Sequence, residues 1–407
     1  MKKLLCTVLS TVLAMSSTAA LNTSAYADSA NTQQVSYNYW YNSSTGYTDE
    51  NVHTRQMEKL DRGLIAIKTD GGVYLSWRLF DSEDNIFGSA DKNVSFNVYR
   101  DGKKISEVAT KTNYVDSTVG TNYSVAPVIN GVEGEKCDAV TVYNNSYFDI
   151  PLSKPDDETI YDPSGNELAT YSFFPADCST GDVDGDGEYE IIVKWTSSEH
   201  DVGSPGDPAY SGTIHLAAYK LDGTKLWKND IALGKNVYSS AHTLQFLVYD
   251  FDGDGKSEVM CQTSLGSKDG QGEYVSNAAQ TDEEIKAITD EENSTADYRG
   301  YGRITEGKEF LTVFNGETGV AMDTINLPTT RGSENGVDYG DDFGNRSNRF
   351  VSDIAYLDGE KPYAIYLRGY YFGRNGKQRT SIAGISWDGT ALSPTYRFDT
   401  QKGQEGY

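Results

Sequence analysis

The chain has 407 residues, a formal charge of −25 and only four cysteines. Its length allows roughly two or three domains with substantial buried cores. The acidic excess argues against nucleic acid as a partner, because nucleic-acid binding requires a basic surface. The 29 Tyr and 40 Gly favour strands and tight turns, so the sequence predicts an all-β protein with one helical pattern, at 281–292.

The first 27 residues have the layout of a secretory signal peptide. Lys2 and Lys3 precede an apolar run over residues 4–15, and small residues then lead to a cleavage site at 25–27. The apolar run is too short to span a bilayer, and no later stretch is long enough, so we expect no membrane association. The sequence therefore predicts a secreted protein whose residues 28–52 form a polar lead-in.

Residues 53–150 are expected to form a small β-sandwich. Short apolar strands alternate there with turn signals such as Asp70-Gly71-Gly72 and Asp101-Gly102. The string from Phe96 to Gly102, together with Trp77, resembles a fibronectin-type-III module. Such a module implies a supporting role or weak contact with glycans.

Three cysteines remain after the predicted leader. They are Cys137, Cys178 and Cys261, an odd number that argues against a disulfide scaffold. A bridge between Cys178 and Cys261 is one interpretation, and small buried hydrophobic side chains are the other.

An Asp-rich loop followed by an apolar strand recurs in the rest of the chain. The copies cover residues 182–195, 250–263 and, in a weaker form, 354–368. Their spacing of about 70 residues is long for a propeller blade, and insertions such as 268–300 could explain the excess. Repeated sheet units of this kind predict an incomplete β-propeller over residues 151–407.

Two of these loops fit the calcium template Asp-x-Asp-x-Asp-Gly-x-x-Glu. Clustered carboxylates repel one another without a cation, which favours a metal site over a merely solvated acidic loop. An EF-hand has a bidentate Glu where Val193 and Cys261 stand, so we expect structural sites instead of sensors. The third loop, 358–360, is expected to bind no metal. The predicted Ca²⁺ ligands are Asp182, Asp184, Asp186, the carbonyl of Glu188 and Glu190 in one loop, and Asp250, Asp252, Asp254, the carbonyl of Lys256 and Glu258 in the other.

A series of short motifs runs in order from about residue 53 to the end of the chain. They include RQME at 55–58, LDRG at 60–63, GDVDGDG at 181–187, KW at 194–195, AH at 241–242, EFLTVFNG at 309–316, GNR at 344–346, AYLDGE at 355–360 and RGYY at 368–371. Each motif alone is weak, whereas the ordered series resembles the bacterial rhamnogalacturonan lyase family. The resemblance implies an eight-bladed calcium propeller that cleaves rhamnose–galacturonate linkages of plant cell-wall rhamnogalacturonan I by β-elimination.

That reaction sets chemical demands on the site. The uronate carboxylate must be neutralised by calcium or arginine, a base must take the C5 proton, and an acid must serve the leaving oxygen. A chain this acidic must build a basic patch locally. The substrate-site candidates are His242, Arg346, Arg349, Arg368 and Tyr370, and each could instead be a structural residue. The catalytic acid and base are not assigned.

Two other functions compete with the lyase hypothesis. A non-catalytic calcium-propeller adhesin or glycan-binding protein would use the same acidic loops. A glycoside hydrolase would need two catalytic carboxylates, but the most clustered acids are assigned to calcium. Members of the resembled family continue beyond the region that matches 401–407, so we expect a truncated chain with little or no activity.

Overall fold

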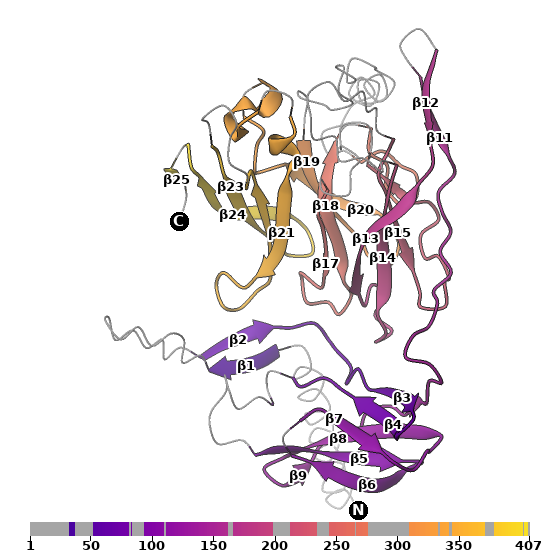
Figure 1. Ribbon diagram of the computed structural model, residues 1–407. Helices are drawn as coiled ribbons and strands as arrows, with labels where there is room; N and C mark the ends of the chain where they lie inside the picture. The colour runs from indigo at the N-terminus through magenta and orange to yellow at the C-terminus, as the bar shows by residue number, and fades with distance from the viewer. Residues whose placement is uncertain are drawn as a thin grey trace, which may run out of the picture. The chain divides into compact units, whose positions relative to one another are not determined.

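The computed structural model describes most of the chain, which forms two compact units, Met1–Asp149 and Ile150–Tyr407 (Figure 1). Nearly all its regular structure is strand, which confirms the all-β prediction. The predicted leader and the predicted helix at 281–292 lie outside the described residues. The structure describes residues 32–36, 52–80, 83, 93–109, 111–161, 166–197, 212–233, 244–264, 266–275, 309–332, 334–341, 344–370, 378–401 and 403–405. Within these ranges no helix is long and apolar enough to cross a membrane.

The first unit contains two antiparallel sheets around one core, formed by residues such as Leu75, Trp77, Phe96 and Val125. The strand orders are β3-β4-β7 and β10-β8-β5-β6, with β9 paired to β8 and a separate β1–β2 hairpin. The strands are β1 (Thr32–Ser36), β2 (Val52–Gln56), β3 (Ile65–Thr69), β4 (Gly72–Ser76), β5 (Val94–Arg100), β6 (Lys103–Val108), β7 (Asn113–Asp116), β8 (Asn122–Ile129), β9 (Val132–Glu133) and β10 (Val140–Thr141).

A buried tyrosine ties the two sheets of this unit together. Tyr123 stands at the start of β8, is 1% exposed, and donates a 3.0 Å hydrogen bond to the carbonyl of Thr118. Its hydroxyl also lies 2.9 Å from the carboxylate of Asp116 at the end of β7. A tyrosine at this corner, bonded to backbone a few residues upstream, is typical of immunoglobulin-like sandwiches. The unit is therefore a β-sandwich of the fibronectin-type-III kind.

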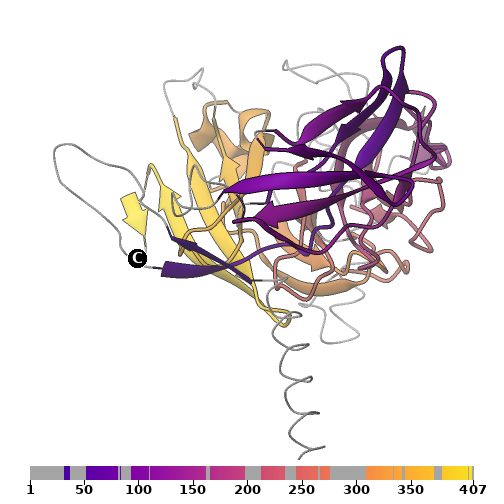
Figure 2. The same cartoon turned by 90° about the horizontal axis from the view of Figure 1, so that it is seen from below.

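The second unit contains three successive antiparallel sheets, each a simple meander, and the three predicted repeats correspond to them. A β11–β12 hairpin precedes them, and two short 3-10 helices precede the third (Figures 1 and 2). The elements are β11 (Glu158–Tyr161), β12 (Glu167–Tyr171), β13 (Phe174–Gly181), β14 (Glu190–Thr196), β15 (His215–Tyr219), β16 (Ile231–Ala232), β17 (Phe246–Tyr249), β18 (Glu258–Ser264), β19 (Glu309–Phe314), β20 (Ala321–Asn326), η2 (Glu334–Tyr339), η3 (Arg346–Asn348), β21 (Phe350–Ala355), β22 (Tyr363–Arg368), β23 (Ser381–Trp387), β24 (Leu392–Asp399) and β25 (Gly403–Glu405).

Each sheet packs against the next one along the chain. The first strands of successive sheets are neighbours, with β13 beside β17 and β17 beside β21. Strand β18 alternates between two cores: Val259 and Cys261 belong to the core shared with the first sheet, and Met260 to the core shared with the third. Side chains of a strand alternate between the two faces of its sheet, so the middle sheet is buried on both faces. All seven residues of β18 are buried, including the polar Gln262, Thr263 and Ser264.

The three described cysteines are all free. Cys261 is buried in the core of the second unit and Cys137 is half-buried, as expected for small hydrophobic side chains. Cys178 on β13 is exposed, so the interpretation of Cys178 as a buried residue is wrong.

Candidate metal loops and inner-strand pocket

The first acidic loop connects β13 to β14 and folds around Asp182. The two carboxylate oxygens of Asp182 accept hydrogen bonds from the amides of Gly185 and Gly187, at 2.7 and 3.0 Å. Both glycines have positive φ, near 79° and 93°, a conformation that glycine adopts without strain. Glu190, the first residue of β14, accepts a 3.0 Å bond from the amide of Val183. The loop thereby directs several carboxylates toward one point.

The second acidic loop, between β17 and β18, repeats this geometry almost bond for bond. Asp250 accepts from the amides of Gly253 and Gly255 at 2.7 and 3.0 Å, and Glu258 accepts from Phe251 at 2.9 Å. The loops also touch, because the amide of Ser257 donates a 2.7 Å bond to the carbonyl of Asp182. The two loops are thus joined across the interface between neighbouring sheets.

The loops bring together most of the predicted ligands. Carboxylate oxygens of Asp182, Asp184 and Glu190 lie within 4.8 Å of one another, and so do those of Asp250, Asp252 and Asp254. The amides of Glu188 and Lys256 donate to Asp186 and Asp254. Closely grouped carboxylates supply the hard oxygen donors that divalent cations require, so the residues fit a metal ion.

The electrostatics of the loops also favour a cation. Burial, with repulsion from the neighbouring carboxylates, raises the pKa of Glu190 to about 7 and that of Glu258 to about 9. Burial likewise raises the pKa of Asp250 to about 6. A carboxylate is hard to ionise when it is buried among other acids, and a bound cation would relieve that cost.

A lysine that the sequence analysis missed reaches the first loop. Lys220 follows β15, and its ammonium lies 2.6 Å from Asp184, 2.8 Å from Asp186 and 4.0 Å from Glu190. These contacts raise the pKa of Lys220. In the second loop, Lys256 instead pairs with Glu317 at 2.5 Å. The available sequence signal for this contact was the position of Lys220 just after β15. The string Lys220-Leu221-Asp222-Gly223 is typical of an ordinary turn, so it does not indicate a contact with the acidic loop.

A polar pocket of about 480 Å³ lies where the first strands of the three sheets meet. Residues of β13, β17 and β21 line it together with the segment before β17 and Tyr370 after β22. We call it the inner-strand pocket. Its lining residues are Asp177, Cys178, Ser179, Leu244, Gln245, Phe246, Phe350, Val351 and Tyr370.

A buried lysine supports one wall of the inner-strand pocket. Lys194 on β14 has no exposed surface; it forms an ion pair with Asp177 and donates a 3.1 Å bond to the carbonyl of Leu244. Burial lowers the pKa of Lys194, while Asp177 opposes that shift. The pair therefore fixes the carboxylate of Asp177 at the pocket wall. A charged residue inside an apolar strand was the available sequence signal for Lys194.

The five predicted substrate-site residues have very different surroundings. Tyr370 is 44% exposed and lines the inner-strand pocket. Arg346 lies near Asp341, with 3.9 Å between Nε and the carboxylate, and Arg349 bonds Asn345 at 3.4 Å. His242 lies outside the described residues.

Arg368, the fifth, is a buried member of the third sheet. Its guanidinium bonds both carboxylate oxygens of Glu309, at 2.7 and 2.8 Å, and the carbonyls of Thr329 and Ser347. Burial tends to raise the pKa of Glu309, but Arg368 and Arg331 outweigh it, so that pKa lies below its usual value. The guanidinium of Arg368 is therefore hydrogen-bonded within the protein. Among the four described candidates, only Tyr370 lines the inner-strand pocket.

A fibronectin-like sandwich followed by meander sheets with paired acidic loops defines a multi-sheet β protein with loops suited to metal ions. The C-terminal domain of rhamnogalacturonan lyase family 11 matches residues 147–407, and the beta-sheet domain of rhamnogalacturonan I lyases matches residues 55–143. The chain therefore belongs to rhamnogalacturonan lyase family 11, which confirms the resemblance seen in its motifs.

Two curated relatives come from Bacillus subtilis (strain 168). The rhamnogalacturonan endolyase YesW is 42% identical over 358 residues, which are 87% of this chain and 51% of YesW. The rhamnogalacturonan exolyase YesX is 40% identical over 360 residues, which are 87% of this chain and 52% of YesX. The crystal structure of YesX matches with a TM-score of 0.68 and 38% identity, over 86% of this chain and 52% of YesX. The chain thus spans about half the length of these relatives.

Proposed function

We propose that the protein is a lyase that cleaves rhamnogalacturonan I, a pectin of plant cell walls, by β-elimination. The family match over residues 147–407 carries this proposal. Both relatives named above are rhamnogalacturonan lyases, one an endolyase and one an exolyase. The signal-peptide pattern of residues 1–27 supports secretion, which would bring the protein to its extracellular substrate.

We also propose that the three sheets are blades of a calcium-binding β-propeller over residues 151–407, which follows a sandwich over residues 53–150 in the chain. Neighbouring first strands and cores shared between sheets support this arrangement. Asp182, Asp184 and Glu190, and in the second loop Asp250, Asp252 and Asp254, would hold one Ca²⁺ each. The metal would supply the shared positive charge that keeps each loop compact.

The inner-strand pocket is the proposed substrate site. It is polar, as a sugar requires, and it lies between strands that are well fixed by two cores. Tyr370 would donate a hydrogen bond or a proton to a bound sugar, and Asp177, which pairs with Lys194, would accept one. β-Elimination needs such acid and base groups at the C5 proton and the leaving oxygen.

The test measures cleavage and binding separately. The chain is incubated with rhamnogalacturonan I and calcium, and the unsaturated uronate that β-elimination forms is followed by its ultraviolet absorption. Product formation by the parent chain that is lost in the Tyr370→Phe variant would support both the lyase activity and the assignment of the inner-strand pocket as the substrate site. Binding without any product, in this chain and in a chain as long as the curated relatives, would instead favour the non-catalytic glycan-binding alternative. Product that is unchanged in the variant would remove Tyr370 from the site.

A further inference from the structure

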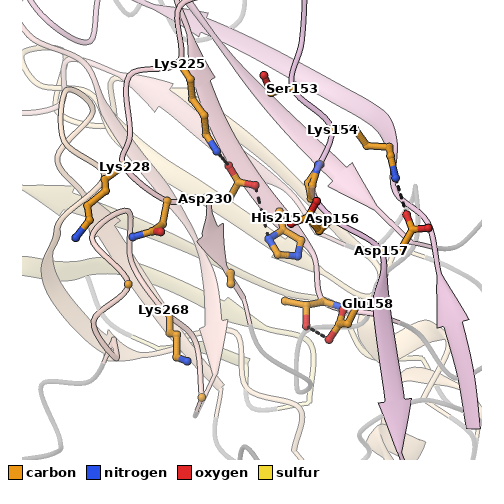
Figure 3. A pocket seen from close by; sticks show the side chains of 16 residues that line it. Ser153, Lys154, Asp156, Asp157, Glu158, His215, Lys225, Lys228, Asp230 and Lys268 are labelled. Atoms are coloured by element: carbon orange, nitrogen blue, oxygen red, sulfur yellow. Dashed lines mark hydrogen bonds and ion pairs between the residues drawn. The ribbon is translucent and has the colours of Figure 1, made fainter. Parts of the chain in front are cut away.

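A second and larger cavity, of about 770 Å³, lies in the second unit and shares no lining residue with the inner-strand pocket. We call it the outer pocket, and it is bounded by residues 153–158, by β15 and β16, and by residues 266–272 (Figure 3). The volume lies within the range typical of ligand-binding pockets, roughly 300–1,000 Å³. Its labelled side chains are almost all charged, which sets it apart from an ordinary packing defect.

One wall of the outer pocket is cationic. Lys228 and Lys268 lie on one side, across the pocket from Asp156, Asp157 and Glu158 (Figure 3). Lys228 is exposed and makes no ion pair with any residue that the structure describes. In a chain whose formal charge is −25, a wall that presents two ammonium groups is unusual.

Backbone hydrogen bonds hold this cationic wall in place. The amides of Ala232 and Lys268 each donate to the carbonyl of the other residue, at 2.9 and 2.7 Å. The amide of Asn229, next to Lys228, donates a 2.9 Å bond to the carbonyl of Gly270. Lys268 also lies over the ring of Tyr274 at 4.8 Å. The two lysines are therefore carried by segments that are fixed before any ligand arrives.

The opposite wall is acidic, and hydrogen bonds hold its Glu158 in place. Glu158 accepts a 2.8 Å bond from the amide of Thr213 and a 3.0 Å bond from its hydroxyl. Asp157 pairs with Lys154 at 2.6 Å. Satisfied carboxylates keep spare lone pairs, so this wall can accept hydrogen bonds from hydroxyl groups.

Between the walls lies a compact polar floor. The imidazole of His215 packs edge-on against Phe173, with 4.8 Å between ring centres. Asp230 lies 3.9 Å from Nδ1 of His215 and pairs with Lys225 at 2.5 Å. Asp230 thereby neutralises Lys225.

We propose that the outer pocket is a second carbohydrate-binding site, which takes a uronate residue of an acidic polysaccharide. The carboxylate would lie against Lys228 and Lys268, and the sugar hydroxyls would donate to the acidic wall. A small inorganic anion would satisfy only the first wall, and a neutral sugar only the second. A uronate carries both groups on one ring, so it alone among these ligands matches both walls.

The choice of polymer rests on the proposed lyase function. Isothermal titration calorimetry with calcium present compares a rhamnogalacturonan oligosaccharide with its carboxyl-reduced, neutral form. The variants are Lys228→Gln, Lys268→Gln and the double variant. The matched control is Lys361→Gln, which changes an exposed lysine between β21 and β22. We expect about tenfold weaker binding of the acidic oligosaccharide by the double variant, and weaker binding by the parent chain as salt increases.

Two further comparisons make the result decisive. Binding of the neutral oligosaccharide, and all binding by the control, should stay unchanged. Affinity of the acidic oligosaccharide within twofold in all three lysine variants would overturn the second site. Because Lys228 is exposed, its variant is informative even if Lys268→Gln fails to fold. Product formation is assayed separately, in this chain and in a chain as long as the curated relatives. Uronate-dependent binding without product in both removes the lyase proposal only, and product with unaltered binding in the variants removes the outer site only.

Discussion

The two acidic loops have nearly the same letters and the same backbone hydrogen bonds, yet their electrostatics differ. In the first loop the ammonium of Lys220 lies between Asp184 and Asp186. In the second loop the corresponding carboxylates have no such partner among the described residues, since Lys256 turns to Glu317. Burial raises the pKa of the loop-closing glutamate in both loops, to about 7 for Glu190 and about 9 for Glu258, and Lys220 lowers that of Glu190 by a smaller contribution. A shared motif therefore does not guarantee equal affinity for a cation.

The difference arises from neighbours that lie far away in the sequence. Lys220 comes from the end of β15 and reaches back across the sheet to the first loop. Around the second loop, Gly389 in the turn between β23 and β24 lies so close that an added Cβ would be 3.0 Å from Asp252. Packing by the next sheet buries the second loop more deeply. We infer that the first loop carries part of its counter-charge internally, whereas the second loop depends on a bound metal.

Removal of all metal should have the largest effect on this pair of loops. A chelator is expected to lower the melting temperature of the second unit by about 10 °C, because the grouped carboxylates lose their shared counter-ion. Scanning calorimetry with calcium and with chelator measures the change. Equal melting temperatures under the two conditions would mean that neither loop is a structural metal site.

Single ligand removals should separate the loops. Asp252→Ala is expected to abolish one site and cost about 2–3 kcal/mol of unfolding free energy in saturating calcium. Asp184→Ala should cost about 1 kcal/mol less, because Lys220 still neutralises part of the remaining charge. Calcium stoichiometry and chemical denaturation measure both quantities. A larger loss in Asp184→Ala would reverse the proposed ranking.

The metal-free protein should become more stable as pH falls from 9 to 5. In the folded state the pKa of Glu258 is about 9, above its value in the unfolded chain. The cost of ionising Glu258 in the folded protein is therefore absent below the unfolded-state pKa, and it grows as pH rises toward 9. We expect a change of about 2 kcal/mol, smaller than the full shift because local opening admits water. Denaturation in chelator across this range measures it, and Glu258→Gln should flatten the curve. Calcium-saturated protein with the same slope would argue against the explanation.

Charge removal beside the loops should have the smallest effects. Lys220→Met is expected to tighten calcium binding at the first loop about tenfold, because the tethered ammonium no longer competes. Lys256→Met is the matched control; its exposed pair with Glu317 contributes little, so stability should change by less than about 0.5 kcal/mol. Calorimetric titration distinguishes the two. Identical affinities in parent and Lys220→Met would show that Lys220 moves aside without cost.

Interactions between residues close together in the chain account for the elements that the sequence predicted. Alternating acids and glycines with positive φ build an acidic loop from its own residues, so the order of residues alone locates the loops at 182–190 and 250–258. Apolar runs after each loop predicted β14 and β18 to within one residue, since their burial dictates their composition. The ordered motifs likewise identified the family.

Tertiary structure decided everything that depends on residues distant in the chain. Arg368 seemed available for substrate, but packing against η3 and β19 buries it with Glu309, 59 residues away. No local pattern around Lys220 or Lys194 reveals their partners, because those partners are at least 17 residues away in the chain. The outer pocket unites residues from 153 to 272, and no local pattern encodes their distances. Local hydrogen bonding fixes loops and strands, whereas burial and charge pairing between strands fix which side chains remain free to act.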